Sequence, residues 1–483
     1  MTRLFSLPGR LLAIAAFTSL IACRIPAEKR VGSTVAVKAA AQHAGVSFWL
    51  TRADSSVLLE KQDSRHWGAP AGDVTIAVDA SRSFQSIDGF GFTLTGGSAT
   101  LINSLGEPEQ DALLKELFSS EGNGIGLSYL RISIGASDLS AEPFTYNDLP
   151  DGRTDTGLVR FTLEREKADL IPVLKKIVAI NPGIRILGSP WSAPRWMKTN
   201  NSFIGGSLKK EYYPVYAAYF VRYIREMKKE GITIDAITIQ NEPLHPGNNP
   251  SMYMEAAEQG TFIRQYLGPA FRRSGIRTKI ILYDHNLDKP EYPVSILNDP
   301  ETRKYVDGSA FHLYAGDIRT LSDVHNAHPD KHVYFTEQWI GGPGNFADDF
   351  RWHMKTLVIG ATRNWSRNVL EWNLAADENY QPHTDQGGCT SCLGGLTISG
   401  QRVRRNTAYY VLAHASKFVP PGSVRIASND VPDLPNVAFR TPGGKIALVV
   451  MNDGKDARNF NVQAGEKAFS AMLDPGSAGT FVW

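Results

Sequence analysis

Two glutamates stand directly after apolar, β-branched runs of the sequence, where strands would end. Glu242 follows Asn241 behind the run 236–240, and Glu337 follows the later run 332–336. A pair of carboxyl groups carried on the C-terminal ends of separate parallel strands is the minimum equipment for cleaving a glycosidic bond. The pair alone is compatible with retention or inversion of configuration and with any sugar.

The segments that must position these glutamates read as alternating strands and helices. Apolar strand-like runs are followed by helix-like segments with apolar residues at three- and four-residue spacing, which is typical of a parallel sheet. Eight such runs favour a closed (β/α)8 TIM barrel, an α/β fold in which polar residues at the C-terminal strand ends converge. The runs comprise residues 90–95, 128–134, 185–189, 236–240, 279–283, 309–314, 332–336 and 368–373.

Both ends of the chain contain short β segments separated by turn residues. They lie in residues 46–84 and again in residues 406–483, and neither set is long enough to form a convincing sandwich alone. We therefore expect the N- and C-terminal strands to combine into one accessory β-sandwich domain. The catalytic barrel domain is then predicted to span residues 85–405.

Aromatic and polar side chains gather at the predicted strand ends. Trp191, Tyr314 and Trp372 can stack on the apolar C–H faces of sugar rings, and amides such as Asn241 can bond to hydroxyl groups. His312 is equally compatible with a sugar contact and with a hydrogen-bonded residue that fills the barrel. This inventory predicts a carbohydrate substrate.

Composition excludes several classes of protein. The 483 residues are 42% hydrophobic and 21% charged, which is ordinary globular chemistry with material for one large core and an accessory domain. The formal net charge of +2 gives no basic field for a phosphate backbone, so nucleic acid is not an expected partner. We also expect no cofactor.

The N-terminus has the pattern of an export signal. Basic residues precede the apolar stretch 11–22, which is too short to span a bilayer comfortably, so residues 1–22 are predicted to be a signal peptide. The residues up to Cys23 resemble a bacterial lipobox, which implies cleavage before Cys23 and its acylation. We therefore expect an exported protein of the periplasm, outer membrane or cell surface, anchored to the membrane through Cys23 and a linker over 23–45. The alternative is a signal peptide that happens to end in cysteine.

Besides Cys23 the sequence has two cysteines, Cys389 and Cys392. Structural zinc would need two further ligands that no second CxxC motif supplies, so no metal is expected. In an oxidising compartment the pair is predicted to form a small disulfide-closed loop.

The central chain resembles glycoside hydrolase family 30, and within it the glucosylceramidase type. Six motifs in the family's order carry the resemblance, which covers residues 85–426 and extends more weakly to the C-terminus. The motifs are Gly89-Phe-Gly-Phe92 with Leu94-Thr-Gly-Gly97, Leu130-Arg-Ile-Ser-Ile-Gly135 with Asp138, Gly188-Ser-Pro-Trp-Ser-Ala-Pro-Arg-Trp196, Gln240-Asn-Glu-Pro243, Phe335-Thr-Glu337 and Glu371-Trp-Asn-Leu-Ala375.

The resemblance implies a retaining mechanism with Glu242 as acid/base and Glu337 as nucleophile. Retention requires the two carboxyl groups to lie about 5 Å apart. Asn241 would hold the 2-hydroxyl of the sugar, an interaction that strengthens in the transition state. Arg131 and Tyr314 would orient Glu337 and keep it ionised.

The same resemblance assigns the sugar contacts. Asp138 and Trp191 match positions that grip the non-reducing glucose, and Trp372 matches a residue of the pocket wall. The chain departs from the glucosylceramidase pattern at residues 381–389, where that pattern expects a Pro-Asn-Trp-like loop. The departure puts the aglycone side of the site in question.

Three functions follow from these observations. The leading expectation is a β-glucosidic hydrolase of the glucosylceramidase type that acts on glycolipid-like β-glucosides. An endo-β-1,6-glucanase is the alternative within the enzyme class, since the same barrel and carboxylates serve both and only the loops after the strands differ. A non-catalytic sugar-binding lipoprotein is the third, and the presence of both glutamates argues against it.

Overall fold

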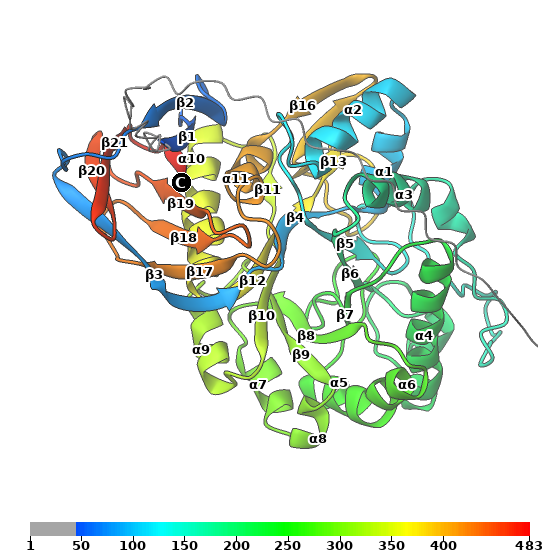
Figure 1. Cartoon of the computed structure of the whole chain (residues 1–483). Helices are drawn as coiled ribbons and strands as arrows, with labels where there is room; N and C mark the ends of the chain where they lie inside the picture. Colours follow the sequence, from blue (N-terminus) through cyan, green and yellow to red (C-terminus); the bar gives the residue numbers. More distant parts are fainter. Residues whose placement is uncertain (1–44) are drawn as a thin grey trace, which may run out of the picture. The chain divides into compact units, whose positions relative to one another are not determined.

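The computed structural model describes residues 45–483, which form one compact unit (Figure 1). The predicted signal peptide, Cys23 and the linker up to residue 44 lie outside the described residues. Within residues 45–483, no helix has the length and apolar character needed to cross a membrane. The described chain comprises an eight-stranded barrel and a nine-stranded antiparallel and parallel sheet.

The barrel is closed, and all eight of its strands are parallel to their neighbours (Figure 1). Each of the eight predicted runs forms one of its strands, so the predicted (β/α)8 fold is confirmed. In barrel order the strands are β10 (His332–Glu337), β12 (Ser366–Asn373), β4 (Gly89–Thr93), β5 (Tyr129–Ser133), β6 (Arg185–Ser189), β7 (Ala236–Thr238), β8 (Lys279–Asn286) and β9 (Val306–His312).

A layer of apolar side chains fills the inside of the barrel. Seven buried residues in mutual contact come from seven different strands, which places them in the barrel interior. Because the strands are buried on this inner face and on the helix-covered outer face, they read as nearly continuous apolar runs in the sequence. The layer consists of Tyr129, Leu187, Ala236, Ile281, Ala310, Tyr334 and Leu370.

Helices connect the strands and cover the outside of the barrel (Figure 1). The α-helices are α1 (Gly96–Asn103), α2 (Glu107–Phe118), α3 (Leu170–Ile180), α4 (Tyr213–Lys229), α5 (Ala256–Phe262), α6 (Gly268–Arg273), α7 (Glu291–Leu297), α8 (Pro300–Arg303), α9 (Thr320–Ala327), α10 (Phe346–His353) and α11 (Thr407–Ser416). Three 3-10 turns, η1 (Glu164–Lys167), η2 (Arg195–Met197) and η3 (Lys210–Tyr212), and two π-helical segments, η4 (Ile263–Leu267) and η5 (Met354–Ala361), complete the set.

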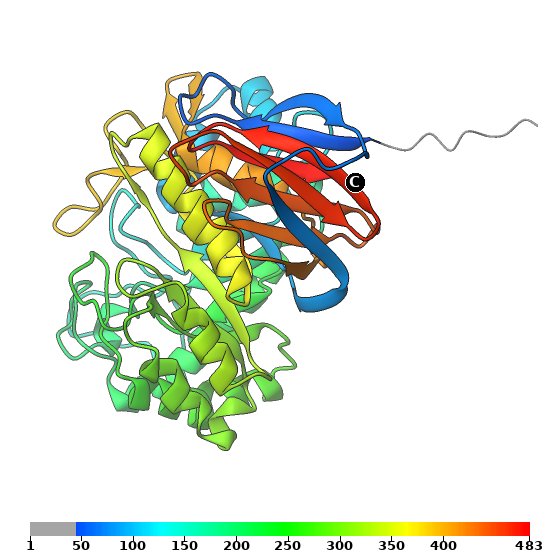
Figure 2. The same ribbon diagram turned by 90° about the vertical axis from the view of Figure 1, so that its left-hand side faces the viewer.

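The second sheet is built from both ends of the chain, as expected. In Figures 1 and 2 the blue N-terminal strands lie among the orange and red C-terminal strands, and β1 pairs with β22 while β3 pairs with β17. The two edge strands, β2 and β21, also contact each other, so the sheet wraps around its own apolar core as a β-sandwich. In sheet order the strands are β2 (Glu60–Arg65), β1 (Val46–Thr51), β22 (Ala478–Val482), β19 (Ile446–Met451), β18 (Asn436–Arg440), β17 (Val424–Ser428), β3 (Val74–Ser86), β20 (Arg458–Ala464) and β21 (Lys467–Leu473).

Helix α11 joins the two parts. It packs against α10 and β4 of the barrel and against β22 of the sheet. The buried His414 on this helix makes hydrogen bonds with the Oγ1 atoms of Thr51 and Thr480, both at 2.9 Å. The sequence places residues 406–416 in the second domain, whereas here α11 covers the barrel and the C-terminal strands begin at Val424.

Short strands after β10 and β12 form two small sheets over the barrel. Strand β11 (Ile340–Gly341) pairs with β14 (Cys392–Leu393). Strands β13 (Ala375–Ala376), β15 (Leu396–Ser399) and β16 (Arg402–Arg405) form the other sheet. The segment after β12 is thereby held against the segment that follows Glu337.

Candidate active site

A cavity of about 390 Å³ opens where the barrel strands end, and it brings together most of the predicted site residues. Those that line it are Asp138, Trp191, Asn241, Glu242, Tyr314, Glu337 and Trp372. Arg131 and His312 do not line the cavity, and both are fully buried behind the carboxylates. Both residues hold other side chains in this structure, and a sugar contact of His312 stays a prediction.

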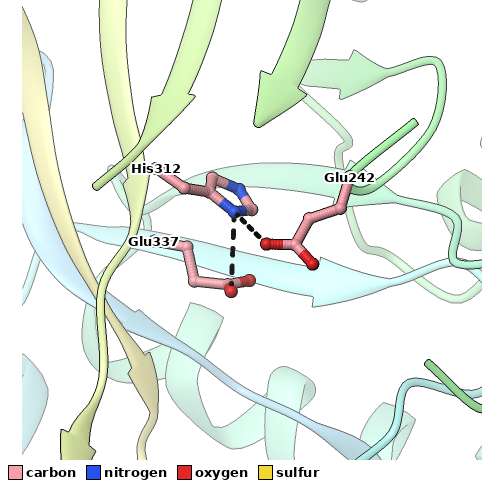
Figure 3. A group of neighbouring side chains, drawn as sticks. All are labelled: Glu242, His312 and Glu337. Carbon is pink, nitrogen blue, oxygen red and sulfur yellow. Dashed lines mark hydrogen bonds and ion pairs between the residues drawn. The ribbon is translucent and has the colours of Figure 1, made fainter. Parts of the chain in front are cut away.

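The two glutamates face each other across the cavity floor (Figure 3). Glu337 is the last residue of β10, and Glu242 follows β7. An oxygen of one carboxyl group lies within 4.8 Å of an oxygen of the other. This spacing fits direct attack by one carboxylate on a sugar whose leaving group is protonated by the other, and it leaves too little room for the water that inversion requires.

The backbone at Glu242 is held in an unusual conformation. Its φ of +46° lies in the left-handed region, which costs a non-glycine residue about 1–3 kcal/mol. The Glu242 N–H donates to the carbonyl oxygen of Asp284 at 3.0 Å, and the Glu242 carbonyl accepts from the N–H of His245 at 2.9 Å. These bonds fix the turn that aims the carboxyl group into the cavity.

Arg131 and Tyr314 both donate to the Glu337 carboxylate. Tyr314 Oη lies 2.9 Å from Glu337 Oε1, and the Arg131 guanidinium forms an ion pair with Oε2. Arg131 also donates to Asn241 Oδ1 at 2.6 Å and to Asp284 Oδ2 at 2.9 Å. One buried guanidinium thus sets the orientation of the predicted nucleophile and of the amide expected to hold the 2-hydroxyl.

Asp284 is the centre of this buried network, a role that the sequence did not reveal. Its carboxylate is inaccessible to solvent and accepts hydrogen bonds from the hydroxyl groups of Ser189, Thr238 and Thr336 at 2.7–3.0 Å. Burial raises the pKa of Asp284, but Arg131, followed by His312 and Thr336, outweighs it and holds the pKa well below its usual range. The only sequence signal is its place at the end of a predicted strand.

His312 lies between three carboxyl groups (Figure 3). Its Nδ1 is 3.1 Å from Glu242 Oε1 and 3.6 Å from Glu337 Oε1, and its Nε2 is 3.1 Å from Asp284 Oδ1. With a proton on each nitrogen, the imidazolium donates to Glu242 on one side and to Asp284 on the other. Asp284 therefore fixes the ring that contacts the acid/base.

These contacts move the pKa values of the group. Burial lowers the pKa of His312, but the surrounding carboxylates, Glu337 above all, raise it to about 9. Burial raises the pKa of Glu242, whereas the hydrogen bond and the charge of His312 turn the net direction downward. For Glu337 burial outweighs the lowering by His312 and Arg131, so its pKa is raised. Arg131 and Tyr314 both donate to this carboxylate as expected, while the ionised state of Glu337 stays a prediction because its pKa is raised.

The balance of these pKa values places an acidic proton on the His312 side of its contact with Glu242. Transfer of that proton across the 3.1 Å to Oε1 produces the acid form of Glu242 and a neutral imidazole. The transfer needs no proton from solvent. The pair can therefore supply a leaving group with a proton even where an isolated glutamate would be ionised.

Asp138 and two tryptophans form the wall opposite this pair. Trp191 and Trp372 are almost fully buried with ring centroids 5.4 Å apart, and the Trp191 indole N–H has no partner among the described residues. Burial, followed by the charge of Glu337, raises the pKa of Asp138 to about 8, so its carboxyl can donate as well as accept. An indole face with free polar groups beside it is suited to a glucose ring.

Cys389 and Cys392 are joined in a disulfide that forms part of the same wall. Cys392 packs in one apolar cluster with Trp191 and Trp372. Since Cys392 also pairs with Gly341 in the β11–β14 ladder, the bridge ties the cavity wall to the segment behind Glu337. The sequence predicted the bond but not its place in the site.

Four further polar residues line the side of the cavity next to Glu242, and none of them was among the predicted substrate contacts. Asn248 donates to Glu242 Oε2 at 3.3 Å, and His245, His285 and Asn286 complete this side, whereas Trp339 packs against the cluster of Trp191 and Trp372. Except for His285 and Asn286, which end a barrel strand, these residues lie in loops. Loop positions carry no periodic signal that would bring them together from sequence alone.

Glu242, His312 and Glu337 also have donor atoms close enough to hold a metal ion. Hydrogen bonds already engage these atoms, however. His312 Nδ1 binds Glu242, while Glu337 accepts from Arg131 and Tyr314. The arrangement matches the acid/base and nucleophile pair predicted from the sequence.

Comparison with known proteins agrees with this geometry. The glycosyl hydrolase family 30 TIM-barrel domain matches residues 87–419, and the family's beta sandwich domain matches residues 422–481. An endo-1,6-beta-D-glucanase of Aspergillus fumigatus is 36% identical over 422 residues, covering 82% of this chain and 84% of that protein. The lysosomal acid glucosylceramidase of Mus musculus is 29% identical over 437 residues, covering 84% of this chain and 83% of the mouse protein.

Solved structures point the same way. The structure of an endo-beta1,6-glucanase superimposes with a TM-score of 0.85 at 34% identity, covering 91% of this chain and 99% of the other. The barrel, the sandwich and the paired glutamates are thus those of a glycosidase, and the chain belongs to glycoside hydrolase family 30.

Proposed function

We propose that this glycosidase is a retaining endo-β-1,6-glucanase, with Glu337 as nucleophile and Glu242 as acid/base. The observation that carries the mechanism is the short separation of the two carboxyl groups, within 4.8 Å at their nearest oxygens. The linkage is supported by similarity, since three endo-1,6-beta-D-glucanases are 33–37% identical to this chain, against 26–30% for the similar glucosylceramidases. The glucosylceramidase reading favoured by the motifs becomes the second candidate.

The reaction proceeds in two displacements. Glu337 attacks the anomeric carbon while Glu242 gives its proton to the glycosidic oxygen, so the bond to the leaving sugar breaks and a glycosyl ester forms on Glu337. Glu242, now ionised, takes a proton from water, which attacks the same carbon and releases Glu337. The released sugar keeps the β configuration.

The loop of residues 381–389, which differs from the glucosylceramidase pattern, supports a glucan over a glycolipid as the substrate. Residues 381–389 replace the loop expected of a glucosylceramidase, and the residues beside Glu242 are histidine and asparagine side chains. A ceramide would present two alkyl chains to this side, and alkyl chains are poorly matched to polar groups that need hydrogen-bond partners.

A substrate panel tests the proposal. Purified enzyme is incubated with a linear β-1,6-glucan, with glucosylceramide and with an aryl β-glucoside, and the products are separated by chromatography. We expect a ladder of β-1,6-linked oligosaccharides, and Glu337→Gly serves as the inactive control. Release of ceramide without a glucan ladder would instead establish the second candidate.

We further propose that the protein is exported and attached to a membrane through Cys23. The support is the sequence pattern of residues 1–23, which resembles a lipoprotein signal. Metabolic labelling with a palmitate analogue tests this, with Cys23→Ser as the matched control. A full-length protein that takes up no label would refute the anchor.

A further inference from the structure

The two sides of the cavity must bind different parts of the substrate. Glu242 gives its proton to the oxygen of the leaving group, so the leaving group lies against the side next to Glu242. The sugar that forms the ester with Glu337 lies against the wall of Asp138, Trp191 and Trp372 described above. The residues beside Glu242 therefore decide which leaving group is accepted.

Four side chains on this side share one kind of chemistry. They are the amides of Asn248 and Asn286 and the imidazoles of His245 and His285. Asn286 Oδ1 accepts from the N–H of Tyr314 at 2.9 Å, and the Asn286 amide nitrogen has no hydrogen bond within residues 45–483. The His245 side chain likewise has no hydrogen bond there, although its backbone holds the Glu242 turn.

The side chain of His285 gives independent evidence that a ligand can bind on this side of the cavity. Its side chain lines the cavity at only 7% exposure, and its buried Nδ1 has no hydrogen-bond partner in the described part of the chain. Buried polar groups are nearly always paired, so an unpaired one in a cavity marks a place where a ligand can bond. Burial lowers the pKa of His285 to about 4, which leaves the ring neutral with one donor and one acceptor.

We propose that His245, Asn248, His285 and Asn286 form the subsite that binds the leaving glucose unit of the glucan. Amides and imidazoles can form hydrogen bonds with sugar hydroxyl groups, and the four side chains include no carboxylate, lysine or arginine that would select a charged ligand. The assignment rests on the proposed function and names the part of the substrate that these residues recognise.

The subsite should also bind an acceptor sugar after the leaving group has departed. In that step the ester bond between Glu337 and the anomeric carbon breaks, a bond from that carbon to the acceptor oxygen forms, and the acceptor's hydroxyl proton passes to Glu242. Water competes for the same ester but needs no sugar subsite. The ratio of the two reactions therefore reports on the subsite separately from the catalytic pair.

The experiment uses the full enzyme trapped with a 2-deoxy-2-fluoro-β-glucoside carrying a good leaving group. The trapped enzyme is reactivated in water alone and in rising concentrations of gentiobiose, cellobiose or laminaribiose. Variants are His245→Ala, His245→Gln and His285→Ala, with Lys289→Ala, an exposed residue near β8, as the matched control. Melting temperatures confirm that each variant folds.

We expect saturable reactivation of the wild type by gentiobiose. The half-saturating concentration of gentiobiose should rise at least roughly tenfold in both alanine variants, after correction for any change in reactivation by water. His245→Gln should recover part of the loss, because its amide still bonds to hydroxyl groups. Lys289→Ala should behave as the wild type. Half-saturation that stays at the wild-type value, or losses that match those in water alone, would overturn the assignment.

The design separates this inference from the proposed function. If β-1,6-glucan is not cut but another disaccharide reactivates the enzyme through these residues, the subsite stands with a different linkage. If no disaccharide reactivates the wild type, the subsite is refuted. If no ester is trapped, the retaining mechanism fails, and the same variants are then compared by how strongly gentiobiose inhibits hydrolysis of an aryl β-glucoside. Equal inhibition of wild type and variants would again refute the subsite.

Discussion

His312 Nδ1 lies 3.1 Å from Glu242 Oε1, so an imidazole directly contacts the carboxyl group that must give up a proton. The other nitrogen of the ring is anchored to Asp284, whose charge is compensated by Arg131. Glu242, the proposed acid/base, lines the cavity and is at the same time coupled to a buried proton carrier. This coupling has consequences for the pH dependence of the reaction.

The pH profile of kcat/KM should be bell-shaped, with a plateau that extends further toward alkaline pH than an isolated glutamate acid would allow. Activity is lost as the pH falls through the pKa of Glu337, which is raised, so the acidic limb should lie above the ordinary pKa of a glutamate. It is lost again as the pH rises through about 9, where the pair of Glu242 and His312 gives up its proton. Hydrolysis of an aryl β-glucoside across pH 4 to pH 10 measures both limbs.

Replacing His312 with Gln should lower the basic limb of this profile. Without the imidazole, Glu242 must hold the proton itself, and the limb should fall by at least about one pH unit below the wild-type value near 9. The acidic limb should rise, because the charge of His312 lowers the pKa of Glu337 more than that of Arg131 does. A variant whose two limbs both stay at the wild-type positions would show that His312 carries no proton for the reaction.

The two glutamates should differ in how their loss is rescued. Glu242→Ala should slow hydrolysis of substrates with poor leaving groups by roughly 100- to 10,000-fold, and much less for activated aryl glucosides, since these need no proton. Glu337→Gly should abolish turnover of both. Added azide distinguishes the roles, because it can attack the ester in the first variant and replace the missing nucleophile in the second. Glucosyl azide should therefore form with β configuration in the first and α configuration in the second, as measured by NMR.

Sequence reasoning worked best where one local pattern determines one element. All eight barrel strands could be located because a strand buried on both faces is an uninterrupted apolar run. The predicted run 236–240 extends beyond the observed β7, which ends at Thr238, because the chain must turn there to reach the left-handed conformation of Glu242. No propensity rule marks such a turn.

For the site as well, residues marked by a local pattern could be predicted and roles that depend on the whole fold could not. Glu242 and Glu337 were identified because they follow strands, whereas the roles of Arg131, His312 and Asp284 depend on which side chains the barrel brings within hydrogen-bond distance. Burial separates a residue that touches sugar from one that holds a carboxylate, and burial is a property of the whole fold. For that reason the sequence left His312 open between a sugar contact and a residue that fills the barrel.

Removing the charge of Asp284 should destabilise the protein as well as inactivate it. Asp284→Asn leaves the fully buried Arg131 without one of its two ionic partners, and breaking a buried ion pair costs about 3–5 kcal/mol. Denaturant unfolding and kcat measure the two effects. Asp288→Asn, a nearby exposed carboxylate, is the control and should change neither. An Asp284→Asn variant with wild-type stability would mean that the network tolerates an amide in place of its central charge.

The disulfide should matter for the shape of the cavity more than for overall stability. Its loop is short, so removing it should cost about 2 kcal/mol of unfolding free energy by the loop-entropy relation. Yet Cys392 packs on Trp191 and Trp372, and loosening this wall should raise KM for the glucan because the sugar platform loses its support. The double variant Cys389→Ser, Cys392→Ser is compared with the wild type in oxidising and reducing buffer. Reducing agent should raise the KM of the wild type toward that of the variant and leave the variant unchanged, whereas an equal KM for both proteins would show that the wall holds without the bridge.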